Sequence, residues 1–400
     1  MLISGVLVVE EIDKCPYCGS YNWINYGHSY SKKTGLRKQI FHCNDCKRHK
    51  TGSAVEIAPP KRKLIDLKNF KYKSQPMPRQ NWSAYTKAQN NEKRLLMETL
   101  TEILAQTKVI VANDKLGRKY SDMKDICFAL VLKTYTRLSS RRLNSDLEKA
   151  QHEQFISKVP HFTTLMNWLE KEEMTDLLLE LIKLAALPIK KVETQYAIDS
   201  SGFSSNQFGR WFNFVYGEET VCRNWVKAHI TVGTKTNMVI GVELTKAHGA
   251  DITQFIPLVE KVSKDFTVKE ISADRIYISE KNLEIAISHG AMPYIPFKSN
   301  NISRGHGAIW KKMWFYQREH PQEFFEHYHR RSNVESTFSM IKQKFGKDVV
   351  TKNFQSQTNE VLLKILCHNI CCLIQEYYEN NLEKLYSTDP TKIPIKIRLS

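Results

Sequence analysis

The chain lacks any long uninterrupted run of apolar residues. Its most apolar late stretch, EVLLKILCHNICCLIQEYY (360–378), is broken by Lys364, His368 and Asn369. Because a membrane-spanning helix needs about 20 apolar residues in a row, we expect no such helix and interpret this stretch as a buried helix. The opening MLISGVLVVEE has no basic segment and reaches an acid at Glu10, so it is a poor candidate for a signal peptide.

Acidic residues are the scarcer charged type. The 400 residues include 59 Lys and Arg but 42 Asp and Glu, for a formal charge of +17. Residues 1–80 alone hold 15 basic and 6 acidic side chains. This excess favours a polyanionic partner, most often nucleic acid, with an anionic membrane surface as the alternative. The composition, 42% hydrophobic and 25% charged, is that of a globular chain with two or three domains.

The cysteines do not have the even number expected of a disulfide framework. There are nine of them, which favours a reducing compartment, and we expect a cytoplasmic protein associated with the nucleoid. Five lie in mostly apolar contexts and are interpreted as small core residues: Cys127, Cys222, Cys367, Cys371 and Cys372.

The remaining four cysteines form two ordered pairs. Cys15 and Cys18 are followed, after 24 intervening residues, by Cys43 and Cys46, and both pairs have C-x2-C spacing. Four thiolates are the ligand set of a tetrahedral structural zinc, and we expect two short strands around the turn KKTGLRK between the pairs. We therefore predict a zinc ribbon over residues 1–55 with one structural Zn²⁺ that supplies much of its folding energy. Redox or disulfide cysteines are the alternative.

Basic residues crowd the predicted ribbon and the segment after it. Zinc ribbons bind either DNA or protein, and seven basic side chains favour contact with the DNA backbone: Lys32, Lys33, Arg37, Lys38, Lys47, Arg48 and Lys50. The stretch APPKRKLIDLKNFKYKSQPMPRQ is rich in proline and lysine. We interpret residues 56–88 as an extended basic linker.

Residues 89–188 have helical apolar spacing with serine, threonine or asparagine near the helix starts. In one segment, Ser139 or Ser140 would cap a short helix that begins with Arg141 and Arg142. Short helices joined by tight turns are typical of a helix-turn-helix DNA-binding module, in which we expect the two arginines to contact DNA. A plain helical bundle is the alternative.

From residue 189 the pattern becomes that of an α/β domain with a mixed sheet, predicted over 189–378, with a tail over 379–400. The expected order is strand, hairpin, helix, strand, helix, strand, helix. In such a sheet the first and fourth strands lie side by side. Asp199 lies at the end of the first and Asp274 at the end of the fourth, so we expect the two carboxylates to meet at one edge.

A late basic stretch, YHRRSNVESTFSMIKQKFG (328–346), holds one carboxylate, Glu335. At about 100° per residue in a helix, Tyr328, Arg331, Glu335 and Lys342 would share a stripe of roughly 60°. A core-facing helix would show apolar residues there. The alternative is a surface ion pair between Arg331 and Glu335, which stabilises a helix by only about 0.2–0.5 kcal/mol.

Three clustered carboxylates repel one another unless cations compensate. Two Mg²⁺ or Mn²⁺ ions would do so, and they would also activate a water or a 3′-hydroxyl for phosphodiester displacement. Glu335 is positioned to complete such a site with Asp199 and Asp274. For either aspartate alone, a turn cap after a strand is the alternative.

These residues resemble a prokaryotic insertion-sequence transposase of the DDE class, which implies an RNase H-like catalytic core. The family spacing is tyrosine, two residues, arginine, three residues, glutamate, six residues and lysine, and this chain fits it without a gap. The resemblance covers about residues 120–375. It implies metal ligands at Asp199, Asp274 and Glu335. It implies contacts to transposon-end phosphates from Tyr328, Arg331 and Lys342.

A second match is the run DRIYIS, in which Tyr277 and Ser279 fit the family pattern and Ile276 stands where a small residue is usual. The resemblance implies an enzyme that binds double-stranded DNA at terminal inverted repeats, cuts it and joins the ends to target DNA, as a homodimer and without a membrane. Two alternatives remain: a metal-dependent nuclease or resolvase on the same core, and a non-catalytic DNA-binding regulator.

Overall fold

The computed structural model describes residues 14–30, 36–57, 64–74, 80–107, 109–110, 122–205, 225–380 and 397–398. Contacts divide the chain into two units, Met1–Leu64 and Ile65–Ser400, and each is treated by itself. Several predictions lie outside the described residues: those on Lys32, Lys33 and Cys222, part of the linker and most of the C-terminal tail.

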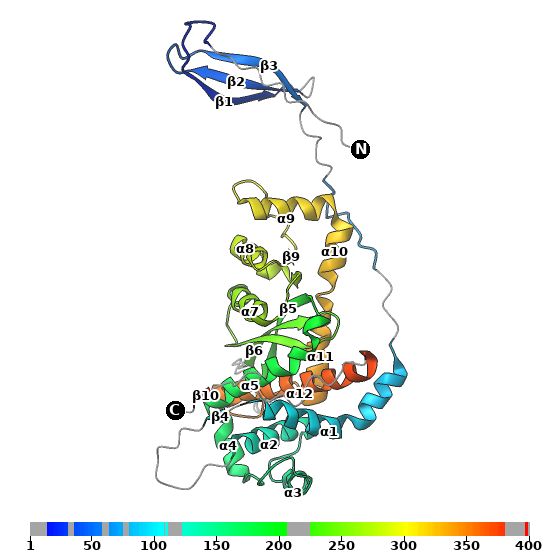
Figure 1. Ribbon diagram of the computed structural model, residues 1–400. Coiled ribbons are helices and arrows are strands. Elements are labelled where there is room, and N and C mark those ends of the chain that lie inside the picture. The colour runs from blue at the N-terminus through cyan, green and yellow to red at the C-terminus, as the bar shows by residue number, and fades with distance from the viewer. Residues whose placement is uncertain are drawn as a thin grey trace, which may run out of the picture. The chain divides into compact units, whose positions relative to one another are not determined.

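The N-terminal unit contains one antiparallel sheet with the order β1-β2-β3 (Figure 1). Its strands are β1 (Trp23–Tyr30), β2 (Leu36–Cys43) and β3 (His49–Ile57). The sequence suggested only the first two. The third pairs with β2 immediately after the second cysteine pair, so that the knuckle Cys43–Cys46 is itself the connection between β2 and β3.

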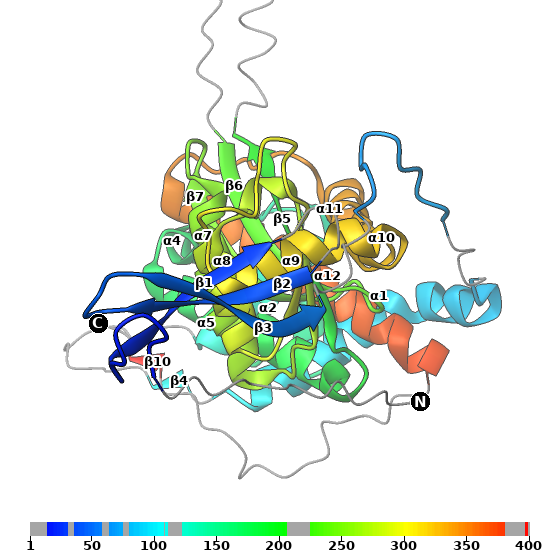
Figure 2. The same ribbon diagram turned by 90° about the horizontal axis from the view of Figure 1, so that it is seen from above.

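The second unit is built on a five-stranded mixed sheet with the order β7-β6-β5-β8-β9; Figure 2 shows β7, β6 and β5 side by side. Its strands are β5 (Gln195–Ser204), β6 (Trp225–Gly233), β7 (Val239–Lys246), β8 (Glu270–Ala273) and β9 (Met292–Tyr294). The pairs β5–β6 and β6–β7 are antiparallel, whereas β5–β8 and β8–β9 are parallel. The predicted neighbourhood of the first and fourth strands of this domain is confirmed.

Strand β5 contributes to the cores on both faces of the sheet. Ala197 and Phe203 belong to one buried apolar cluster, and Tyr196 and Ile198 belong to the other. This division follows from the alternation of side chains along a strand. Because both faces are covered, β5 is apolar at successive positions until Asp199 interrupts it.

Helices cover both faces. One cluster includes residues of α7 (Asp251–Asp265), α8 (Glu280–Ser288), α9 (Ala308–Glu319) and α10 (Pro321–His329). The other includes residues of α1 (Trp82–Ala105), α2 (Met123–Thr136), α3 (Asn144–His152), α4 (Phe162–Leu169), α5 (Glu172–Ala186), α11 (Ser332–Phe345) and α12 (Phe354–Asn380). Short elements complete the unit: η1 (Leu187–Lys191), η2 (Arg275–Tyr277), β4 (Val109–Ile110) and β10 (Ile397–Arg398).

Helix α12 is the buried helix that the sequence predicted. The polar residues that interrupt its apolar run find partners inside the protein: Lys364 Nζ donates to the carbonyls of Gly346 and Asp348, and His368 Nε2 bonds the carbonyl of Asn237. Asn369 both accepts from and donates to the backbone of β7. Within the described residues, no helix is long and apolar enough to cross a membrane.

Three of the cysteines interpreted as core residues are buried: Cys127, Cys367 and Cys371. Cys372 is half-buried. Burial raises the pKa of the Cys127 and Cys371 thiols to about 12, so these thiols stay protonated at neutral pH and act as apolar packing groups.

The segment predicted as an extended linker over 56–88 is partly ordered against the second unit. Ile65 N donates to the carbonyl of Arg318 at 2.9 Å, and the ring of Phe70 stacks on Phe325 with centroids 5.8 Å apart. Helix α1 begins at Trp82, because Asn81 Oδ1 caps it by accepting from Ala84 N at 3.1 Å. The linker interpretation therefore does not hold for residues 65–74 and 82–88.

The helix expected to begin at Arg141 begins later, at Asn144. Arg141 and Arg142 lie in the turn after α2, where Ser139 Oγ accepts from Arg142 N at 3.5 Å. The serine stabilises this turn rather than the first turn of α3, whose own N-cap, Leu143, has no side-chain bond.

Candidate active site and cysteine cluster

Parallel pairing of β5 with β8 brings Asp199 and Asp274 to one edge of the sheet. Ile198 pairs with Ala273, and each aspartate is the next residue along its chain. Asp199 Oδ1 accepts from the N–H of Ser200 at 2.8 Å, and Asp274 Oδ1 accepts from that of Arg275 at 2.6 Å. Asp274 is the N-cap of η2, so the turn-cap interpretation also describes it.

Arg331 connects the third carboxylate to the first. Its Nη1 lies 2.5 Å from Asp199 Oδ2, and its Nη2 lies 2.7 Å from Glu335 Oε1. The arginine side chain is 19% exposed, whereas that of Glu335 is 60% exposed. The ion pair between Arg331 and Glu335 therefore forms. The same arginine also pairs with Asp199 on the sheet, so the pair is not confined to the surface of α11.

The three carboxylates influence one another electrostatically. Burial raises the pKa of Asp199, and the negative charges of Asp274 and Glu335 raise it further, while the Ser200 N–H and Arg331 lower it. The site therefore carries more negative charge than Arg331 neutralises. Among the described residues, the carboxylates do not converge to within 4.8 Å as a group; the four cysteines do. An ion bound by all three acids would take the place of the guanidinium on at least one of them.

The stretch 328–346 is not one continuous helix, and this corrects the stripe expected from the sequence. Helix α10 ends at His329 and α11 begins at Ser332. Between them, Arg331 N bonds Tyr328 O and Val334 N bonds Arg331 O, both at 2.9 Å. These i to i+3 bonds tighten the turn and place Tyr328 on a different helix from Glu335. The ring of Tyr328 still lies 5.9 Å from the Arg331 guanidinium.

Lys342, about two turns after Glu335 on the same face of α11, reaches β5. Its Nζ donates to Ser201 Oγ at 2.6 Å, two residues after Asp199, and lies 5.3 Å from the centre of the Phe203 ring. Burial lowers the pKa of this ammonium group. The structure thus brings Arg331 to Asp199 and Lys342 to Ser201 on β5, and Ser201 is a residue that the sequence did not mark.

A polar cluster around Asp251, not anticipated from the sequence, includes Ser200, the residue after Asp199. Asp251 Oδ1 accepts from Ser200 Oγ at 2.9 Å and from Lys227 Nζ at 2.6 Å, and it lies 3.3 Å from His229 Nδ1. Burial lowers the pKa of His229. These side chains come from β5, β6 and the start of α7, so no local spacing in the sequence could have grouped them.

The DRIYIS run forms η2 and the start of α8. Tyr277 is fully buried, and Ser279 caps α8 by accepting from Asn282 N at 3.1 Å. Ile276 is 47% exposed. The larger side chain at this position therefore extends into solvent and requires no repacking of the core.

Arg141 and Arg142 are both exposed. The guanidinium of Arg141 lies over the ring of Phe162, 4.8 Å from its centre. In the described part of the chain, no ion pair connects either arginine to the carboxylates. Their predicted role in DNA binding stays a prediction.

The four predicted zinc ligands converge in the N-terminal unit. All four Sγ atoms lie within 4.8 Å of one another, with Cys15–Cys46 and Cys18–Cys43 each at 3.6 Å. A tetrahedron with Zn–S bonds near 2.3 Å has an S–S edge of about 3.8 Å. The sulfur atoms therefore fit a zinc ion.

The two C-x2-C knuckles share a backbone conformation. The residue after each second cysteine has positive φ, +74° at Gly19 and +60° at Lys47. Asp45 joins the knuckles by accepting from Ser20 Oγ and, at 3.1 Å, from Asn22 Nδ2. The rings of His42 and His49 pack on each other, with their centroids 4.6 Å apart.

Asp199 was expected at the end of its strand, but β5 continues to Ser204 through its pairing with β6, and only its pairing with β8 stops before Asp199. Asp199 and Asp274, each just past this parallel pairing, with a glutamate, an arginine and a lysine beside them, define a site suited to metal-dependent phosphoryl transfer. Residues 190–370 match the family model of the transposase DDE domain. The match supports a DDE transposase family, whose members bind and cut DNA and use a divalent metal. The matched region contains all three carboxylates. No curated protein matched the chain.

Proposed function

We propose that the protein is an insertion-sequence transposase with an RNase H-like catalytic core. It binds the terminal inverted repeats of its element, cuts a strand at each end and joins the freed 3′-hydroxyl to target DNA, as a homodimer on paired ends. The observation that carries this proposal is the meeting of Asp199, Asp274 and the Arg331–Glu335 pair at one sheet edge, inside the region that matches the transposase DDE domain.

Asp199, Asp274 and Glu335 are the proposed ligands of two Mg²⁺ or Mn²⁺ ions. The donor set fits, because hard carboxylate oxygens suit these ions, and because burial, followed by the negative charges of Asp274 and Glu335, raises the pKa of Asp199. When bound, such ions activate a water or a 3′-hydroxyl and stabilise the leaving oxygen.

The basic residues position the DNA. Arg331 has five N–H donors, and in this structure two of its nitrogens hold Asp199 and Glu335 in place. With a cation bound by these carboxylates, the Arg331 guanidinium would be free to bind a phosphate oxygen with fork geometry. Lys342 contributes an ammonium group held against β5 by its bond to Ser201.

The four cysteines are proposed to bind one structural zinc, and the ribbon they fold is proposed to contact the DNA backbone. Lys38, Lys47 and Arg48 are exposed on this unit, and Arg48 lies over the ring of Tyr17. In the second unit, the turn that holds Arg141 and Arg142 is proposed as a further DNA contact, within a helix-turn-helix-like region.

The test uses end-labelled DNA fragments from either side of the gene, incubated with purified protein and Mg²⁺ or Mn²⁺. Wild type, Glu335→Gln and the control Glu260→Gln are compared on a sequencing gel. Glu260 is exposed on α7 and carries the same substitution away from the carboxylates. We expect cleavage at a discrete end and joined products from wild type and control, and a loss of at least about 100-fold in Glu335→Gln.

Binding of these fragments should persist in Glu335→Gln, because the change removes a negative charge and no cation. Discrete cleavage without joined products would indicate a nuclease or resolvase. Binding without cleavage in every protein would indicate a non-catalytic regulator. A Glu335→Gln protein that cuts and joins as well as wild type rules out the proposed active site.

A further inference from the structure

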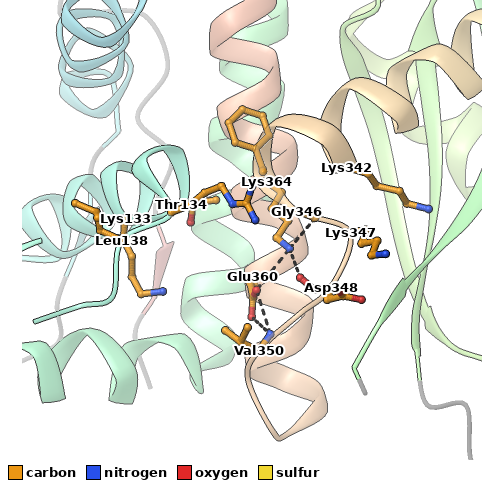
Figure 3. Close-up of a pocket in the computed structure, with 12 residues that line it drawn as sticks. Lys133, Thr134, Leu138, Lys342, Gly346, Lys347, Asp348, Val350, Glu360 and Lys364 are labelled. Carbon is orange, nitrogen blue, oxygen red and sulfur yellow. Dashed lines mark hydrogen bonds and ion pairs between the residues drawn. The ribbon is translucent and has the colours of Figure 1, made fainter. Parts of the chain in front are cut away.

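A basic pocket lies beyond the carboxylates, where the end of α2 faces the end of α11 (Figure 3). It has a volume of about 450 Å³. In Figure 3, Lys133 lies on one side, Lys342 and Lys347 lie on the other, and Lys364 is between them. Five of the side chains that line the pocket are basic, and two, Asp348 and Glu360, are acidic.

The acidic residues do not neutralise this pocket. Glu360 is occupied by the backbone of the pocket's own loop, since its carboxylate accepts from the N–H of Val350 at 3.0 Å and pairs with Lys364 at 3.6 Å. Within the described residues, no carboxylate lies at ion-pair distance from Lys133, Arg137 or Lys347.

The negative ends of the neighbouring helices do not neutralise the excess positive charge of the pocket either. The C-termini of α2 and α11 both border the pocket, and each contributes about −0.5 of a charge. Together they offset about one of the three excess positive charges. Burial lowers the pKa of Lys133 and Lys342, which shows that their charge is held at a cost that a bound anion would reduce.

The loop that closes the pocket is held rigidly. Lys364, which is buried, donates to the carbonyls of Gly346 and Asp348 at 3.1 and 2.5 Å. Gly346 has φ +91°, which L side chains rarely adopt, and the guanidinium of Arg137 lies beside its Cα. Val349 N donates to Ser204 O at 2.8 Å, so the loop is attached to the last residue of β5.

The pocket and the carboxylates are connected by α11. Helix α11 runs from Glu335 to the pocket at Gly346, a distance of about 17 Å at 1.5 Å per residue. Lys342 lines the pocket and also contacts Ser201 near Asp199. Phosphates of one DNA strand follow one another at about 3.4 Å along the helix axis, so this distance corresponds to about five nucleotides.

We propose that Lys133, Arg137 and Lys347 hold a backbone phosphate of DNA about five nucleotides from the bond cut at the carboxylates. The inference rests on the proposed function for its partner and deepens it by naming a second contact. The ligand chemistry is that of a phosphate oxyanion. A free inorganic phosphate offers the same chemistry, and the experiment separates the two sources.

The experiment measures binding of the full-length protein to a labelled DNA duplex of mixed sequence at a series of KCl concentrations. Arg137→Gln and Lys347→Gln are tested singly and together; both side chains are exposed, so the melting temperature should not change. The control is Lys264→Gln, an exposed lysine on α7, which packs on the opposite face of the sheet. Because the pocket holds one phosphate, the double variant should reduce the slope of log K against log [KCl] by about 0.9, and each single variant by less than the double.

Slopes equal to those of wild type and Lys264→Gln overturn the proposal. Inorganic phosphate, added at constant ionic strength, gives the second arm. If it raises the melting temperature of wild type but not of Arg137→Gln, while the DNA slopes stay unchanged, the pocket takes free phosphate and the DNA assignment is wrong.

The cleavage assay with Glu335→Gln distinguishes this failure from failure of the proposed function. If the salt slopes are unchanged and wild type cleaves DNA while Glu335→Gln does not, the DNA contact at the pocket is rejected and the transposase proposal stands. Reduced slopes, with no cleavage by wild type, keep the pocket as a DNA contact and remove the catalytic proposal.

Discussion

The two units of this chain are stabilised by different means. In the described part of the N-terminal unit, the buried apolar side chains are Cys15 and Cys43, and Tyr21 and Tyr26 are 72% and 62% exposed. The second unit has two extensive buried clusters, one on each face of its sheet. A small sheet without a core needs a cross-link, whereas a large one does not. The comparison therefore predicts that each unit can be destabilised without the other.

Removal of zinc should have the largest effect. Structural zinc contributes about 10 kcal/mol or more to the folding of such modules, so a chelator or Cys43→Ser should abolish amide-exchange protection in β1, β2 and β3. The second unit should melt at an unchanged temperature. Zinc content and hydrogen exchange measure both, with Cys127→Ala, a change in the other unit, as the control for loss of a cysteine. Full protection in a zinc-free protein would contradict this assignment.

Truncation in the core of α12 should have the converse effect. Leu366 is fully buried, and replacing such a leucine by alanine costs about 2–5 kcal/mol through lost burial and a cavity. Leu366→Ala should lower the free energy of unfolding of the second unit by this amount in urea, with zinc content unchanged. Loss of zinc from this variant would show that the two units are not independent.

Acid should weaken the second unit through His368, with the smallest of the three effects. Burial lowers the pKa of this imidazole to about 4 from 6.5. Between these values the unfolded chain binds a proton that the folded one does not, so stability falls as the pH falls from 6.5 to 4, by up to about 3 kcal/mol. His368→Gln should flatten this slope in urea titrations, and His289→Gln, at an exposed position, should not. Equal slopes in the two variants would exclude His368 as the cause.

The order of elements along the chain was enough to place Asp199 beside Asp274, because the succession of strands and helices dictates which strands of a mixed sheet are neighbours. The cysteine spacing likewise predicted the cluster of four sulfur atoms. Both signals are local or topological, and both are independent of exact side-chain packing.

The sequence could not show what lies between the predicted residues. The Arg331 bridge to Asp199 and the Ser201 contact with Lys342 join segments more than 100 residues apart. The interruption at Arg331 was missed because a pattern at 100° per residue assumes a uniform helix, whereas i to i+3 bonds tighten this turn. Strand β3 was missed because HKTGSAVEI has little apolar alternation and is ordered by pairing with β2.

Because the pocket loop is bonded to Ser204, two rigid segments fix the distance between the pocket and the carboxylates. One segment is α11, from Glu335 to Gly346, and the other is β5, from Asp199 to Ser204, about 17 Å at 3.3 Å per residue. The Lys342–Ser201 hydrogen bond joins the two segments along their length, and the bond from Val349 N to Ser204 O joins them next to the pocket. If the pocket binds DNA and the carboxylates cut it, as proposed, two rigid segments of about equal length set the spacing between the bound phosphate and the cut bond. One residue inserted into either segment would then change that spacing.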